Sequence, residues 1–277
     1  MRLDENVNGI PINYSLRMAV FSWSEKSQEP SLVLKCLELI REACDIFDNG
    51  YIDLISLGAK GKYSKRKYGD KNWELMESRL ANEELSSISF YNKKMILEPP
   101  RYEVAAFINE LSEKYYFHNN HIYITIPIVA DLEKLREYKL LFEQLVKVFD
   151  ADYGFANVYM ESTDVRAEAL AFSKLIDIYP IDCLNHSSHE GEVKQIKDIN
   201  WLNFLSKLHL SQIEEIPKDL CCDYKYIKDG LYFSVSEKPQ FDNEGDKERI
   251  NKLREITKDI ITEDNWWKRY ESRFPKK

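Results

Sequence analysis

The chain has 277 residues, of which 44% are hydrophobic, 13% aromatic and 31% charged, a composition that is typical of a globular protein and excludes a disordered one. The formal net charge is −8 at pH 7. A nucleic-acid-binding role is disfavoured, because such surfaces need clustered Lys and Arg, and a basic protein partner is favoured instead.

The sequence gives no sign of export or of membrane insertion. No segment reaches the roughly 20 apolar residues that span a bilayer, and the N-terminal stretch lacks the apolar region and cleavage site of a secretion signal. The five cysteines are odd in number and include the adjacent pair Cys221 and Cys222, unlike a secreted disulfide framework. We therefore expect reduced thiols and a cytoplasmic protein.

The first part of the chain is expected to alternate strands and helices. Apolar residues recur at helical spacing from Ser31 onward, between a predicted strand over residues 14–23 and another over residues 51–58. The elements expected after these are a basic surface loop over 60–71, a helix over 72–84 with Trp73, Met76 and Leu80 on one face, a strand over 87–92 and a helix over 101–115 that follows two prolines.

The order strand, helix, strand then recurs over residues 121–128, 132–149 and 153–160. The segment FDNGYIDLIS is echoed by FDADYGFANVY, which indicates a degenerate internal duplication or the general similarity of β-α-β units. The predicted fold class is α+β, with mixed or antiparallel sheets covered by helices; if the echo is a duplication, two degenerate β-α-β-containing halves pack together. No flexible linker divides the chain, so we expect one compact unit over 1–277 with possible sub-halves 1–118 and 119–277.

The C-terminal part is predicted to mix short elements with polar loops. In chain order these are a helix over 164–175, an exposed loop over 186–192, a short helix over 201–208, a strand over 230–236, a polar loop over 237–248 and a long helix from Arg249.

The sequence offers two candidate metal sites, one for zinc and one for Mg²⁺. Cys183, His186 and His189 are spaced like zinc ligands that Cys221 and Cys222 could complete, but adjacent cysteines do not easily point at one ion. A solvated loop and buried thiols explain these residues better, and we expect no metal and no cofactor.

An acidic pair followed by a lysine resembles the metal site of a nuclease. Asp182, Glu192 and Lys194 imitate the D…(D/E)-x-K pattern that holds Mg²⁺ and orients a water. The same triplet recurs elsewhere in this charged chain, so chance explains it better. Since the familiar phosphate-binding, nucleophile-elbow and zinc-protease motifs are missing, we expect a protein that is not an enzyme. The alternative is a divalent-metal nuclease or a zinc hydrolase.

Two charged segments are candidates for partner binding. Lys62, Lys65, Arg66 and Lys67 could contact an RNA backbone, although a solvated loop is the simpler interpretation. The better candidate for a basic partner is the acidic loop around an aromatic residue, which comprises Glu237, Phe241, Asp242, Glu244, Asp246 and Glu248.

Two short apolar motifs carry a resemblance to a known family. The chain reads WLNFL at residues 201–205, GLYFS at 230–234 and then Lys238-Pro239 before a helix. This order resembles the bacterial immunity protein 52 / DUF3396 family, whose members show a W-x-x-F-L helix, a G-L-x-F/I strand, a proline-containing loop and a last helix. The resemblance covers roughly residues 164–260.

The resemblance implies a role but no catalytic residues. Proteins of this family are encoded beside polymorphic or type VI secreted toxins and protect the producing cell by binding the toxin. The expected function is therefore stoichiometric occlusion of a cognate antibacterial toxin, and the expected partner is a basic nuclease domain. Because the motif residues are apolar, Trp201, Phe204, Leu205, Leu231 and Phe233 are expected to specify the fold rather than to contact the toxin.

Overall fold

The structure is a computed structural model, and it describes most of the chain. The described residues are 6–7, 10–11, 13–22, 29–43, 52–59, 62–92, 103–107, 120–127, 132–161, 196, 198–239 and 244–261.

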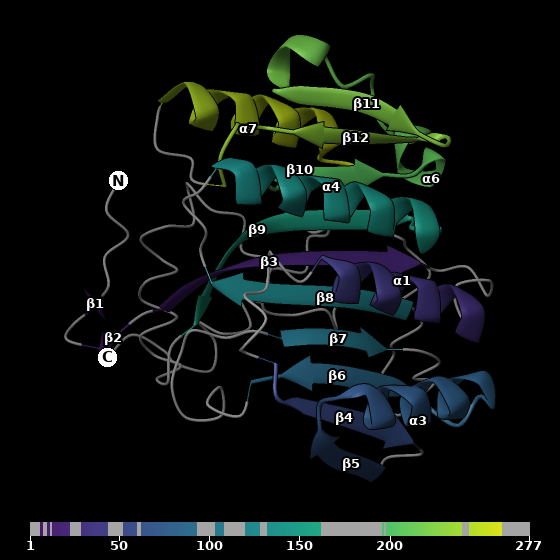
Figure 1. Ribbon diagram of the computed structural model, residues 1–277. Coiled ribbons are helices and arrows are strands. Elements are labelled where there is room, and N and C mark those ends of the chain that lie inside the picture. The colour runs from purple at the N-terminus through teal and green to yellow at the C-terminus, as the bar shows by residue number, and fades with distance from the viewer. Residues whose placement is uncertain are drawn as a thin grey trace, which may run out of the picture.

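One ten-stranded antiparallel sheet organises these residues (Figure 1). In spatial order its strands are β11 (Asp223–Ile227), β12 (Gly230–Ser234), β10 (Leu202–Leu205), β9 (Tyr153–Glu161), β3 (Asn13–Ser22), β8 (Asn120–Pro127), β7 (Glu103–Phe107), β6 (Ser87–Tyr91), β4 (Leu54–Ala59) and β5 (Lys62–Lys67). A separate small pair joins β1 (Asn6–Val7) to β2 (Ile10–Pro11). The α+β fold class with antiparallel sheets covered by helices is confirmed.

Three helices lie on one face of the sheet, in front of it in Figure 1. They are α1 (Pro30–Glu42), α3 (Asp70–Ala81) and α4 (Leu132–Val148). Each presents buried apolar residues at a spacing of three or four, such as Leu37 and Ile40 on α1 and Trp73 and Met76 on α3, and this stripe holds a helix against a sheet. Trp73 stacks on Phe90 of β6 at 5.6 Å.

The other face of the sheet is covered at one end by α7 (Glu244–Thr257). The Arg249 guanidinium of α7 lies 3.4 Å from Cys222 Sγ. The next residue, Asp223, pairs with Lys139 of α4 on the first face. Because neighbouring side chains of a strand point to opposite faces, Cys222 and α7 lie on the other face. The short helices α6 (Lys207–Leu210) and η3 (Lys218–Leu220) connect the strands at this end. Strand β12 is consequently buried along its whole length.

Strand β3 interleaves the two halves of the chain. It pairs with β8 on one side and with β9 on the other, antiparallel to both. The unit β8-α4-β9 therefore has two parallel strands separated by β3, and the unit β3-α1-β4 has two parallel strands separated by β8, β7 and β6. Both units are split β-α-β arrangements, but they occupy different positions in the sheet.

Several sequence-based elements are confirmed. The strands expected at 14–23, 51–58, 87–92, 121–128, 153–160 and 230–236 correspond to β3, β4, β6, β8, β9 and β12, and the helices expected from Ser31, at 72–84 and at 132–149 correspond to α1, α3 and α4.

Four predictions for local structure are wrong. Residues 103–107 form β7 instead of a helix, because they complete the sheet between β6 and β8. Residues 202–205 form β10 instead of a helix; this short apolar run is buried on both faces, where periodicity cannot separate strand from helix. The loop 60–71 contains β5. The helix α7 begins at Glu244, inside the predicted loop 237–248.

Candidate partner-binding surface

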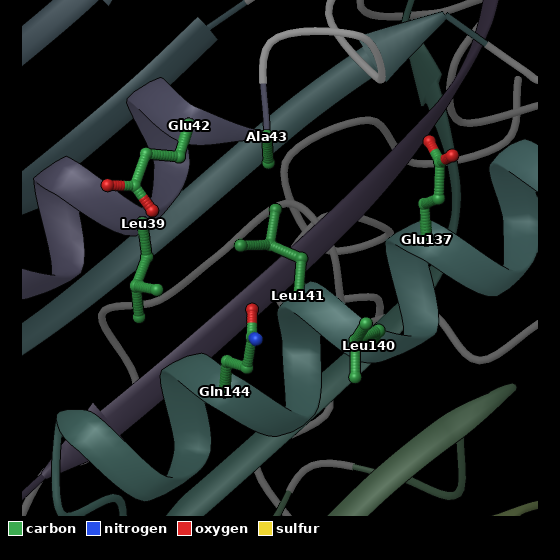
Figure 2. Close-up of a pocket in the computed structure, with 7 residues that line it drawn as sticks. All are labelled: Leu39, Glu42, Ala43, Glu137, Leu140, Leu141 and Gln144. Atoms are coloured by element: carbon green, nitrogen blue, oxygen red, sulfur yellow. The ribbon is translucent and has the colours of Figure 1, made fainter.

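Helices α1 and α4 pack side by side and leave a shallow groove between them (Figure 2). The α1–α4 groove has a volume of about 250 Å³ and is lined by Leu39 and Glu42 of α1, by Ala43 directly after α1, and by Glu137, Leu140, Leu141 and Gln144 of α4. Pockets for small molecules usually measure roughly 300–1,000 Å³. The groove is therefore better sized for one or two side chains of a protein partner than for a small substrate.

Two adjacent leucines of α4 take opposite roles in this groove. Neighbouring residues project about 100° apart around a helix, so Leu141 enters the core at 2% exposure while Leu140 stays 54% exposed. A large apolar side chain at this exposure is the kind of contact that anchors an interface. Leu132, the first residue of the same helix, is also exposed, at 49%.

Carboxylates flank the apolar part of the groove. Glu42 ends α1 and Glu137 lies one turn before Leu141 on α4, and both are exposed. An apolar floor with acidic rims suits the aliphatic stem and cationic head of Arg or Lys. The groove therefore combines an apolar floor with negative charge at its rims.

The opposite flank of α4 is fixed to the edge of the sheet by ion pairs. Lys139 Nζ lies 2.7 Å from Asp223 Oδ2 of β11, and Lys225 Nζ lies 2.5 Å from Glu143 Oε1 of α4. Lys139 and Lys225 also lie over aromatic rings, those of Trp201 at 5.6 Å and Tyr232 at 5.0 Å. These contacts hold α4 in place, so that the groove is presented on a fixed helix.

The environment of Asp223 favours its charged form. Burial by itself would raise the pKa of Asp223, but hydrogen bonds from Lys139 and Ser234 and the charge of Lys225 outweigh it and hold the pKa below its usual value. The pKa of the Tyr232 phenol is raised instead, because burial and the neighbouring carboxylates of Asp223 and Glu143 disfavour its charged form. Tyr232 is thus neutral and Asp223 charged at neutral pH.

The acidic loop predicted as a partner site is only partly as expected. Glu237 is exposed, whereas Glu244 belongs to α7. Asp246 is 3% exposed and its carboxylate is bound by Arg249, so its prediction as part of an acidic surface rim is wrong. Phe241 and Asp242 lie outside the described residues. Asp246 can be buried because its negative charge is paired with Arg249, one turn later on α7.

The predicted metal ligands are for the most part outside the described residues, which include none of Asp182, Cys183, His186, His189, Glu192 and Lys194. Cys221 Sγ is directed to Pro217 O at 3.7 Å and Cys222 Sγ to Val235 O at 3.4 Å. The two sulfurs therefore have separate partners. Within the described ranges no three His, Cys, Asp or Glu side chains form a group that could hold a metal ion.

The described cysteines Cys36, Cys221 and Cys222 are free, and Cys44 and Cys183 lie outside the described residues. Burial raises the pKa of Cys36 to about 12, and burial together with Cys222 and Asp219 raises that of Cys221 to about 12. These two side chains are consequently neutral thiols at neutral pH, a poor state for metal binding or nucleophilic chemistry.

The residues of the α1–α4 groove were not predicted from the sequence. The signal available was the run of three apolar residues Leu140-Leu141-Phe142, since the buried stripe of α4 takes adjacent pairs, such as Leu141 with Phe142, and a third consecutive apolar residue falls outside it. That Glu42 and Glu137 line the same groove depends on the strand order, which places α1 beside α4.

Comparison with known proteins identifies a structural neighbour but no family. No protein-family model matches the sequence, and no curated protein matches it. The fold is shared with a solved structure from Pseudomonas aeruginosa. That structure is titled T6SS protein PA0821; it has a TM-score of 0.67 and 11% sequence identity, and the match covers 94% of this chain and 77% of that one. At this identity the likeness shows the fold alone.

The two apolar motifs noted in the sequence lie on adjacent strands of this fold. Trp201 is fully buried and its Nε1 donates to Ser236 O at 3.0 Å. Phe204 lies against Gly230, where a Cβ atom would come within 2.4 Å of the ring. Both motifs therefore serve the packing of β10 on β12, although the first is a strand and not the expected helix.

Of the helices in the described ranges, none is both long enough and apolar enough to cross a membrane.

Proposed function

We propose that this protein is an immunity protein of type VI secretion, which binds a cognate antibacterial toxin and neutralises it by stoichiometric occlusion. The observation that carries the proposal is the shared fold with a T6SS protein over 94% of this chain. The sequence motifs at 201–205 and 230–239 support the same role independently, because their order resembles that of the immunity protein 52 / DUF3396 family.

The α1–α4 groove supplies a surface for such binding. Leu140 offers an exposed apolar anchor, and Glu42 and Glu137 offer carboxylates for a cationic side chain. A toxin that acts on nucleic acid carries a basic surface, since it must bind phosphates. Occlusion of that surface would stop the toxin without any catalytic step, and opposite charges would also accelerate the encounter.

The direct test uses the product of the neighbouring gene. Both proteins are purified, and their complex is sized by light scattering and its affinity measured by calorimetry. We expect a 1:1 complex and loss of the toxin's activity at equimolar protein. Failure to bind the toxin or to protect cells that express it would sink the proposal. So would hydrolysis by the purified protein alone with added Mg²⁺ or Zn²⁺, which is the enzyme alternative.

A matched pair of variants tests the groove. Leu140→Arg places a cation where a basic partner is expected, and we expect it to weaken toxin binding at least 30-fold, which is about 2 kcal/mol. Leu208→Arg changes another exposed leucine, 36% exposed on α6, and should change the affinity less than 3-fold. If the two variants change the affinity for the toxin equally, the groove is not the interface. The proposal that the protein binds a toxin would still stand.

A further inference from the structure

Strand β5 forms one edge of the ten-stranded sheet and is nearly all exposed. Within the described part of the chain it pairs with β4 and with no second strand, and it lies at the bottom of the sheet in Figure 1. Five of its six residues are exposed, including Tyr63 at 62%. This strand is the open edge nearest to α3.

Four cations gather on this edge in a chain of net charge −8. They are Lys62, Lys65, Arg66 and Lys67. No carboxylate of the described ranges pairs with any of them, although other exposed Lys and Arg side chains do find such partners. The one contact recorded for their side chains is that of Lys65 Nζ, 5.8 Å from the centre of the Tyr91 ring. The edge thus carries an uncompensated positive charge.

The backbone of β5 is available on its outer side. Tyr68 N donates to Asp53 O at 2.8 Å, and the register pairs Leu54 with Lys67. Since hydrogen-bonded positions alternate along an antiparallel pair, residues 62, 64 and 66 bond to β4. The N–H and C=O groups of Tyr63 and Lys65 and the N–H of Lys67 accordingly point to the open edge, at the spacing that an added strand requires; the C=O of Lys67 already accepts from Asn72 Nδ2 at 2.7 Å.

The distribution of the four cations over both faces of the strand indicates which kind of partner could bind at this edge. Alternation along the strand puts Lys65 and Lys67 on one face of the sheet and Lys62 and Arg66 on the other. A nucleic acid lying on one face would reach only half of them. A second copy of β5 would oppose lysine with lysine, which is unfavourable. A strand lying in the plane of the sheet contacts all four.

We propose that β5 binds an extended acidic segment of a partner protein by strand addition. The outward amides of Tyr63, Lys65 and Lys67 pair with the backbone of that segment, and its Asp and Glu side chains meet the cations on both faces. This site is distinct from the α1–α4 groove, and the proposal does not rest on toxin binding.

The test uses the full-length protein and three fluorescent probes, with anisotropy as the readout. The probes are a deca-glutamate peptide, the same peptide with every second backbone amide methylated, and a ten-nucleotide uridine RNA. The methylated peptide keeps the charge but loses the hydrogen bonds of strand addition. We expect the plain peptide to bind at least 10-fold more tightly than either of the other probes.

A charge-matched pair of double variants locates the site. Lys65→Glu/Arg66→Glu should weaken binding of the plain peptide at least 10-fold. Lys207→Glu/Lys238→Glu makes the same change in net charge at exposed positions away from β5 and should weaken it less than 3-fold. Thermal unfolding of both variants checks that the fold is retained.

Three outcomes would overturn the proposal. Equal binding of the plain and methylated peptides would mean charge attraction without strand addition. RNA binding as tight as peptide binding, lost in the β5 variant, would make the edge a nucleic-acid surface. A dimer that dissociates on Lys65→Glu/Arg66→Glu would make a second copy the occupant.

Discussion

Asp223 shows how one carboxylate at the sheet edge joins two elements. Its Oδ2 accepts from Lys139 of α4 and from Ser234 Oγ of β12, both at 2.7 Å. The side chain is 44% exposed, so solvent screens the ion pair and its contribution is that of a surface pair. A second pair, Lys225 with Glu143, joins the same flank of α4 to β11, and each pair contributes modestly.

Replacement of Asp223 by Asn tests this contribution through pH. The lowered pKa means that the charged form stabilises the fold above the ordinary value of 3.8, and that this stabilisation is lost as the pH falls through the folded-state pKa. We expect Asp223→Asn to lower the free energy of unfolding by roughly 0.2–1 kcal/mol at pH 7 and by progressively less below pH 3.8. Urea unfolding at pH 7, 4 and 2.5 measures the difference.

Lys139→Gln provides the matched variant, because it removes the same ion pair from the other side. It should show the same dependence on pH. A loss of stability that is equal at all three pH values would contradict the electrostatic origin and point to packing of the side chains instead.

Elements with a clear apolar period could be predicted from the sequence, and elements without one could not. The helices α1, α3 and α4 each show apolar residues three or four apart because one face is buried and the other exposed. Strand β5 has no apolar period because it is exposed on both faces, and β10 has none because it is buried on both. Strand β11 was not predicted either, because its neighbouring residues Lys225 and Tyr226 are both exposed and it shows no alternation of apolar and polar residues.

The contact between β10 and β12 depends on Gly230. A Cβ atom there would lie 2.4 Å from Phe204 Cζ and 2.8 Å from the carbonyl oxygen of Leu205. The ring could turn, but the carbonyl belongs to a paired strand and cannot move easily. This close approach is the physical reason for the glycine in the GLYFS motif.

Gly230→Ala is therefore expected to destabilise the protein by about 1–3 kcal/mol, as overpacking of a buried site does. Gly154→Ala serves as the comparison, because its Cβ would meet the Phe142 ring at 3.0 Å and the Ala19 carbonyl at 3.3 Å, and we expect a smaller loss. Urea unfolding of both variants measures the difference. A greater loss of stability for Gly154→Ala would contradict this expectation, since it would show that an added methyl group is tolerated less on β9 than on β12.

At the scale of the whole molecule, the sheet order determines the candidate surfaces. The groove exists because α1 and α4, which are far apart in the sequence, cover neighbouring strands. The basic edge exists because β5 ends the strand order instead of forming a loop. A sequence shows which helices are amphipathic but not which of them become neighbours, and this is why Glu42, Glu137 and Leu140 could not be grouped in advance.

The interleaving of β3 also predicts how the molecule folds. Residues 1–118 and 119–277 were expected as possible sub-halves, but β3 of the first half lies between β8 and β9 of the second. A fragment of residues 119–277 would lack the strand that joins β8 to β9, and a fragment of residues 1–118 would leave β3 without either partner. Each fragment would expose the buried apolar residues of the central strands, such as Met18, Ile124 and Phe155.

We therefore expect the intact chain to unfold in urea in a single transition that is the same by fluorescence and by circular dichroism. The separate fragments 1–118 and 119–277 should show no cooperative transition, while mixing them should restore one, since the antiparallel ladders of β3 can form between chains as well as within one. Two transitions in the intact protein, or a fragment that unfolds cooperatively alone, would show that the halves are independent domains and that β3 contributes little to joining them.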